Sequence, residues 1–95
     1  MDWNAKTQEK LKLMIAKIPV FHRGITAAAV IKRAEENALG RKSAAVEEID
    51  VVAAFFCDVP SPFYSMMIRL LDQNGFDYKK YGFPKAQSAA VKTSV

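Results

Sequence analysis

The chain has 95 residues, of which 51% are hydrophobic and 25% charged. This length allows one small hydrophobic core, and the composition is too apolar for an intrinsically disordered protein. Most catalytic architectures need a longer chain to enclose a pocket, so we do not expect an enzyme that acts alone. The 14 basic and 10 acidic residues give a net charge of +4. This mild excess is compatible with a nucleic-acid or an acidic protein partner and diagnostic of neither.

Cysteine and histidine are too scarce to build a metal centre. Cys57 is the only cysteine and His22 the only histidine, which excludes an internal disulfide and a zinc or iron–sulfur site made from several thiolates of this chain. A chain without disulfides fits the reducing cytosol. The N-terminal segment is polar, and no apolar run approaches the roughly 20 residues of a membrane span. We therefore expect a cytoplasmic protein with no membrane span and no cofactor.

Apolar periodicity predicts two helices in the first half of the chain. The first begins after a capping Asn4 and ends near Lys17, because Pro19 disfavours helical geometry in the residue before it. The second covers residues 21–39, and its alanines allow a neighbouring helix to approach closely. Gly40 suits the left-handed position just past the end of this helix.

A third helix is expected to lie at the centre of the fold. It follows a connector at residues 41–45 and an extended Val46, and it begins with acidic residues that complement the helix dipole. It runs to Cys57 and is apolar on nearly every side, which is typical of a buried helix. Cys57 is interpreted as a small core residue.

The fourth helix has the clearest start signal in the sequence. Ser61 is followed by Pro62, a capping residue followed by proline at the first helical position, and Gly75 ends the helix. The sequence thus predicts an all-α fold, a small four-helix domain of residues 1–83 with one very short extended segment near Val46. Residues 84–95 are small and polar and are expected to form a flexible tail.

Few residues are candidates for chemistry. His22 and Cys57 would need to meet to act as base and nucleophile, and nothing in their separation brings them together. His22 is most simply a packed or surface residue; the alternative is a ligand contact shared with Arg23, including an axial bond to a tetrapyrrole metal. The acidic residues around Asp50 are explained by the helix start. Met67 is interpreted as core, with an adaptable binding surface as the alternative.

The aromatic and basic segment at residues 76–83 has two interpretations. In the first, Phe76 and Tyr78 fold back onto the first and fourth helices. In the second, part of this segment docks on a partner, since tyrosine makes a rigid amphipathic anchor. The residues that would dock are Tyr78, Lys79, Lys80, Tyr81 and Phe83.

Three segments read together resemble a known small module. They are Trp3 with KIPVFHRG at residues 17–24, AEENALG at residues 34–40, and VEEIDVVAAF at residues 46–55. Over residues 3–56 the chain resembles the protochlorophyllide-reductase-like domain at the C-terminus of the B subunit of the light-independent enzyme, which also occurs as free-standing small proteins. The family's Ile-Pro-x-Phe-x-Arg turn is matched position by position, by Ile18, Pro19, Phe21 and Arg23.

The resemblance implies an accessory role. The parent enzyme reduces a chlorophyll precursor with an iron–sulfur cluster held by cysteines of other domains, which this chain lacks. We therefore expect a non-catalytic accessory or protein-interaction module that packs on a larger protein in tetrapyrrole or photosynthetic metabolism, as a monomer or a homodimer. The enzymatic alternative is a non-autonomous oxidoreductase subunit that contributes His22 or Asp50 to a site completed by another chain.

A second resemblance keeps a nucleic-acid partner open. Residues 34–55 look like the latter half of a histone fold, in which a helix end, a Gly-Arg-Lys loop and an acidic-start helix follow in order. In that fold the loop cations contact DNA phosphates, and here they would be Arg41 and Lys42. The helix before this loop is shorter than in a histone, and the net charge of +4 is low for strong DNA binding.

Overall fold

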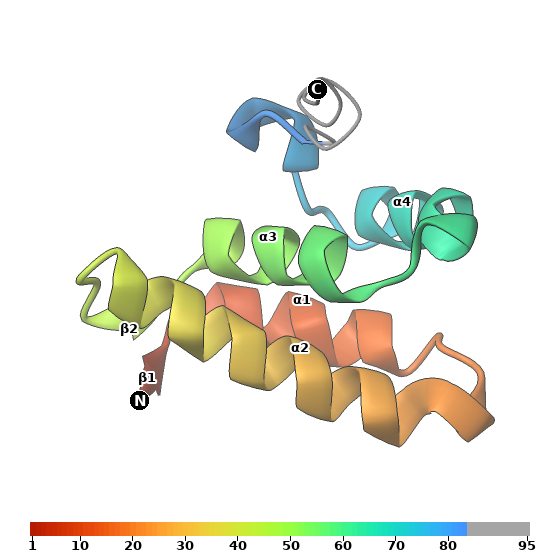
Figure 1. Cartoon of the computed structure of the whole chain (residues 1–95), viewed down its shortest axis with the longest axis horizontal. Coiled ribbons are helices and arrows are strands. Elements are labelled where there is room, and N and C mark those ends of the chain that lie inside the picture. Colours follow the sequence, from red (N-terminus) through yellow and green to blue (C-terminus); the bar gives the residue numbers. More distant parts are fainter. Residues whose placement is uncertain (84–95) are drawn as a thin grey trace, which may run out of the picture.

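The structure, a computed structural model, describes residues 1–83 and shows a small all-α fold (Figure 1), which confirms the predicted fold class. The tail predicted for residues 84–95 lies outside the described residues. The elements follow in the order β1 (Asp2–Trp3), α1 (Ala5–Ile15), α2 (Val20–Gly40), β2 (Ala45–Val46), α3 (Glu48–Asp58), η1 (Ser61–Phe63), α4 (Tyr64–Gln73) and η2 (Tyr78–Tyr81), where η marks a 3₁₀-helix.

Helix α3 is the centre of the core, as its apolar sequence predicts. Figure 1 shows it between the α1–α2 pair on one side and α4 with η2 on the other. Its Val51, Val52 and Phe55 are buried almost completely. Helix α2 meets it through Ala34 and Ala38, which are also fully buried and whose small side chains let the two helices approach closely.

Two short strands join the N-terminus to the loop before α3. Trp3 pairs with Val46 in a parallel register, and the amide of Asn4 donates to the carbonyl of Val46 at 2.9 Å. The indole Nε1 of Trp3 donates to Glu35 Oε2 at 3.0 Å. The extended Val46 is confirmed. Its partner strand was not predicted, because two residues are too few for any alternation of side chains to show.

The first helix begins as predicted and ends slightly early. Asn4 caps it, since its Oδ1 accepts from the amide of Thr7 at 3.0 Å. The helix ends at Ile15, and a tighter turn continues, in which the amide of Lys17 donates to the carbonyl of Met14. Pro19 adopts an extended conformation and begins the next helix.

The end of α2 corrects the prediction for Gly40. Gly40 is the last helical residue, and the left-handed residue is Lys42, with φ of 60°. The amides of Lys42 and Ser43 donate to the carbonyls of Leu39 and Ala38, the pair of hydrogen bonds that defines a Schellman motif. The helix is one residue longer than predicted and the left-handed position lies two residues later, because this loop is held by other contacts, described below.

Helix α4 ends where its sequence predicts. Gly75 has φ of 80°, and the amide of the next residue, Phe76, donates to the carbonyl of Leu71 at 2.9 Å. Phe76 then turns into the core, 2% exposed. The segment begins at Ser61, but Ser61 is the first residue of a 3₁₀-helix and not its cap, since Pro60 is at the cap position and no side chain makes a capping hydrogen bond.

An ion pair fastens the end of this segment to the rest of the molecule. Lys10 Nζ of α1 lies 2.7 Å from Glu48 Oε1 of α3 and also donates to the carbonyl of Gly75 at 2.9 Å. Glu48 Oε2 accepts from the amide of Asp77 at 2.8 Å. Burial alone would raise the pKa of Glu48, but the hydrogen bonds from Lys10 and Asp77 and the charges of Lys10 and Lys80 outweigh it. The pKa therefore lies below its ordinary value.

Replacing Lys42 with glycine should stabilise the protein. A side chain in the left-handed region costs about 1 kcal/mol, which glycine does not incur, so we expect Lys42→Gly to gain about 0.5–1 kcal/mol in urea unfolding. The control is Gly40→Ala. A Cβ at Gly40 meets nothing within 4 Å, so alanine should also stabilise a helical residue 40. If either variant is less stable than the wild type, residue 40 is not helical or residue 42 is not left-handed.

The stability contributed by Glu48 should depend on pH in a defined direction. Because its pKa is lower in the folded protein than its ordinary 4.5, the contribution is complete above that pH and is lost as the pH falls through the folded value. We expect Glu48→Gln to destabilise the protein at pH 7, and the difference from wild type to shrink as the pH falls below 4.5. Glu9→Gln, on an exposed residue of α1, is the control. A difference that stays constant between pH 7 and 3 would refute this role of Glu48.

Candidate functional site: an apolar groove

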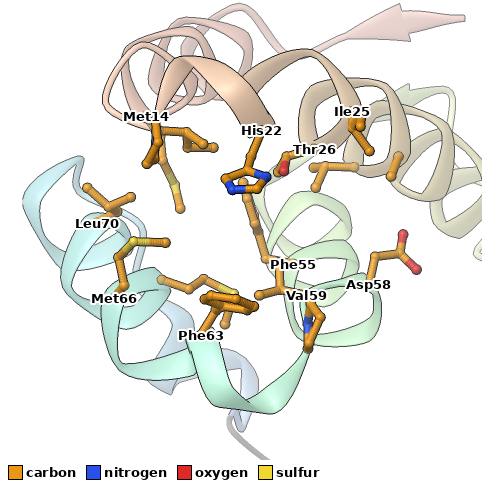
Figure 2. A pocket seen from close by; sticks show the side chains of 16 residues that line it. Met14, His22, Ile25, Thr26, Phe55, Asp58, Val59, Phe63, Met66 and Leu70 are labelled. Atoms are coloured by element: carbon orange, nitrogen blue, oxygen red, sulfur yellow. The ribbon is translucent and has the colours of Figure 1, made fainter.

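A groove with a volume of about 470 Å³ opens between α2, the end of α3 and the η1–α4 segment (Figure 2). Its floor includes Met14, Phe55 and Met67, each at most 2% exposed. The groove forms because the 119° bend between α3 and the next helical segment carries α4 away from the N-terminal half of α2. Met67 is thus both core and part of this surface.

The two walls of the groove carry apolar side chains that remain open to solvent. Ile25 on α2 is 76% exposed, while Phe63 on η1 is 52% and Met66 on α4 is 37% exposed. Val20 and Phe21, in the first turn of α2, are 67% and 87% exposed. Large apolar side chains gathered at one opening are typical of an interaction surface rather than of scattered surface residues.

Polar groups are few in this groove. Figure 2 shows the His22 imidazole pointing into it from α2, with Thr26 beside it and Asp58 near one end. Asp58 pairs with Arg33, whose Nη2 lies 3.3 Å from its Oδ1. The walls can therefore bind apolar groups, and His22 can offer one hydrogen bond.

His22 and Cys57 do not form a bonded pair in residues 1–83. No hydrogen bond joins the two, and this part of the chain holds no group of three or more side chains that could bind a metal ion. Cys57 is exposed, so its interpretation as a core residue is wrong. It lies on the side of the last turn of α3 that the described elements leave uncovered.

Arg23 is a structural residue of the turn between α1 and α2. Its Nη2 donates to the carbonyls of Ala16 and Ile18, both at 3.0 Å, and its Nε donates to Ile18 at 3.2 Å. These bonds satisfy backbone groups that Pro19 leaves without helical partners. The expectation that Arg23 contacts a ligand beside His22 is therefore not supported by its geometry: Arg23 does not line the groove.

Arg41 and Lys42, the two candidate DNA contacts, differ in whether they are already paired with a carboxylate. Arg41 is engaged with Asp50 through Nε–Oδ1 at 2.8 Å and Nη2–Oδ2 at 2.7 Å, and Asp50 is 1% exposed. Arg41 is thus not available as a free phosphate contact, and Asp50 is not accessible as a catalytic acid. Lys42 is exposed in the left-handed position of the loop. Both cations of the predicted pair are therefore exposed, but Arg41 is already paired with a carboxylate.

The aromatic segment at residues 76–83 packs on the core, and one of its predicted docking residues is buried there. Tyr78 is 5% exposed, and its hydroxyl lies 3.4 Å from Asp72 Oδ2, so Tyr78 cannot dock on a partner in this structure. Phe83 stacks on Phe56 with ring centroids 5.0 Å apart, and Tyr81 is half-buried. The interpretation in which Phe76 and Tyr78 fold back onto the core is confirmed by their burial, and the Tyr78 ring lies beside Phe56 of α3 as well as contacting Asp72 of α4.

Two lysines of this segment stay exposed. Lys79 Nζ lies 5.9 Å from the centre of the Tyr78 ring, and Lys80 Nζ lies 5.2 Å from that of Tyr81. Their predicted role in partner binding stays a prediction. The groove residues Ile25, Phe63 and Met66 were not singled out from the sequence as a site. The apolar pair Val20 and Phe21 directly after Pro19 is visible in the sequence, but only the structure shows that it is exposed.

Searches for similar proteins found no match for this chain among protein-family models, curated proteins or solved structures.

Within residues 1–83, no single helix has the length and hydropathy needed to cross a membrane. Helix α3 and residues 61–73 reach that length and hydropathy only as a pair, and the chain bends by 119° between them.

Alanine substitutions should show that the buried Tyr78 stabilises the fold and that the exposed Lys79 next to it does not. We expect Tyr78→Ala to lower the free energy of unfolding by about 3 kcal/mol, because it leaves a cavity beside Phe56. Lys79→Ala should change it by no more than about 0.5 kcal/mol. Urea unfolding followed by circular dichroism measures both. Equal midpoints for the two variants would mean that residue 78 is not part of the core.

Proposed function

We propose that this chain is a non-catalytic interaction module that docks on a larger protein through the apolar groove. The observation that carries the proposal is the combination of a 470 Å³ groove with walls that expose Ile25 and Phe63. Burial of such side chains is the main source of binding free energy in protein association.

The exposed walls favour a polypeptide occupant over a small molecule. A small ligand on the floor would leave Ile25, Phe63 and Met66 in water, since these residues are already more than a third exposed at the rim. An amphipathic helix laid along the groove would cover the floor and both walls at once. Its apolar residues would enter the groove at a spacing of three to four.

The resemblance of residues 3–56 supports an accessory role. The protochlorophyllide-reductase-like domain that these residues resemble is part of a larger enzyme whose iron–sulfur chemistry resides in other domains. By that resemblance, the partner of this chain belongs to tetrapyrrole or photosynthetic metabolism, and the module contributes binding rather than catalysis.

A charge placed in the groove wall should abolish docking. Ile25→Glu keeps an exposed helical residue but would force an unpaired carboxylate into the interface, so we expect at least a tenfold loss of partner capture from a native lysate. Leu39→Glu is the matched control, since Leu39 lies at the other end of α2 and is 65% exposed.

Both variants should retain the helical content and melting temperature of the wild type, because both positions face solvent. The capture is compared at low and high salt, with nuclease added, so that nucleic acid cannot bridge the proteins. Equal capture by Ile25→Glu and Leu39→Glu would place the docking surface elsewhere.

A further inference from the structure

We propose that a second copy of this chain covers the groove when the larger partner is absent. The two copies form a two-fold symmetric dimer, in which Phe21 of each copy enters the groove of the other. The inference rests on the proposed function, because it assigns a resting occupant to the same docking surface. The partner would then bind by displacing the second copy.

The exposed area on this face is close to what a dimer needs. The apolar side chains that flank the groove are Val20, Phe21, Ile25, Phe63 and Met66, and each is at least 37% exposed. Together they leave on the order of 500 Å² of apolar surface in water, near the upper limit for a monomer. A stable interface takes about 800 Å² from each partner. These five side chains would supply more than half of it and the partly exposed residues around them the rest, because the floor is almost completely buried.

The face carries both a protruding group and a cavity, which can make it complementary to itself. In a two-fold interface the same patch meets itself, so whatever fills the groove must lie next to the groove on the same chain. Phe21 meets this requirement. It is the most exposed of the large apolar side chains, at 87%, and it lies one helical turn from Ile25, which lines the groove.

The charges on this face permit two copies to approach. Asp58 is the only carboxylate among the lining residues, and Arg33 of the same chain neutralises it at 3.3 Å. His22 is the only other titratable side chain there. Self-association would therefore bury no unpaired carboxylate, whereas Phe21 would move from water into contact with apolar side chains.

The oligomeric state in solution tests the proposal. Sedimentation equilibrium of the full chain, from about 1 to 500 µM, should show a concentration-dependent dimer for the wild type and for Leu39→Glu. Phe21→Glu should remain monomeric, with its dissociation constant raised at least 100-fold. Because Phe21 and Leu39 are both exposed, circular dichroism should show that both variants fold. A wild type that is monomeric throughout, or a Phe21→Glu variant that dimerises like Leu39→Glu, overturns the proposal.

The contact itself can be located by nuclear magnetic resonance. In a sample that mixes labelled and unlabelled chains, the Phe21 ring should show intermolecular contacts to the methyl groups of Met66 and Met14, which line the groove. Intermolecular contacts confined to other residues, such as Lys79 or Tyr81, would overturn the proposal in favour of another interface.

The two proposals fail in different ways. If the wild type is monomeric and Ile25→Glu still loses partner capture, the second copy is wrong and the docking groove stands. If the wild-type dimer forms through Phe21 but Ile25→Glu captures the partner normally, the groove serves self-association and the proposed docking function fails. If both hold, Phe21→Glu should bind the partner without the competing dimer.

Discussion

The arrangement of the other elements depends on the hydrogen bonds made by the buried carboxylate of Asp50. This carboxylate accepts two hydrogen bonds from Arg41 and one, at 2.9 Å, from the amide of Glu47. Asn37 of α2 donates to the Asp50 carbonyl as well. The end of α2, the loop and the start of α3 are therefore joined at one residue. Only the Asp50 side of this pair is buried, since the Arg41 side chain is 39% exposed, so loss of Arg41 would leave a buried carboxylate without its cation.

The groove follows from two turns at the other end of the helices. Near the start of α2, Arg23 holds the turn around Pro19, which leaves Val20 and Phe21 in the first helical turn without a neighbour. Past the end of α3, the chain bends sharply into η1 and α4. The core is covered near Asp50, whereas apolar side chains near Pro19 remain exposed to solvent. One small domain therefore has both a stable centre and an exposed apolar face.

Much of the fold could be predicted from local signals, while the exposed apolar groove could not. Asn4, Pro19 and Gly75 act through their own backbone or cap geometry, so their effects are visible in the sequence. The end of α2 was predicted one residue too early and its left-handed residue two too early, because the tertiary bond from Arg41 to Asp50 outweighs the preference of glycine for the left-handed position. Cys57 was assigned to the core from its apolar neighbours, but only packing decides which side of a helix end is covered.

The sequence by itself determined the helical class, the order of the four helices and the central place of the apolar helix α3. It also determined that the chain holds a single cysteine and a single histidine, which follows from composition alone. Only the tertiary structure decided that Tyr78 is buried, that Arg41 is engaged with Asp50 and that the groove lies between α2 and α4. The reason is physical: periodicity marks an apolar face, but whether another element covers that face depends on contacts between residues distant in the chain.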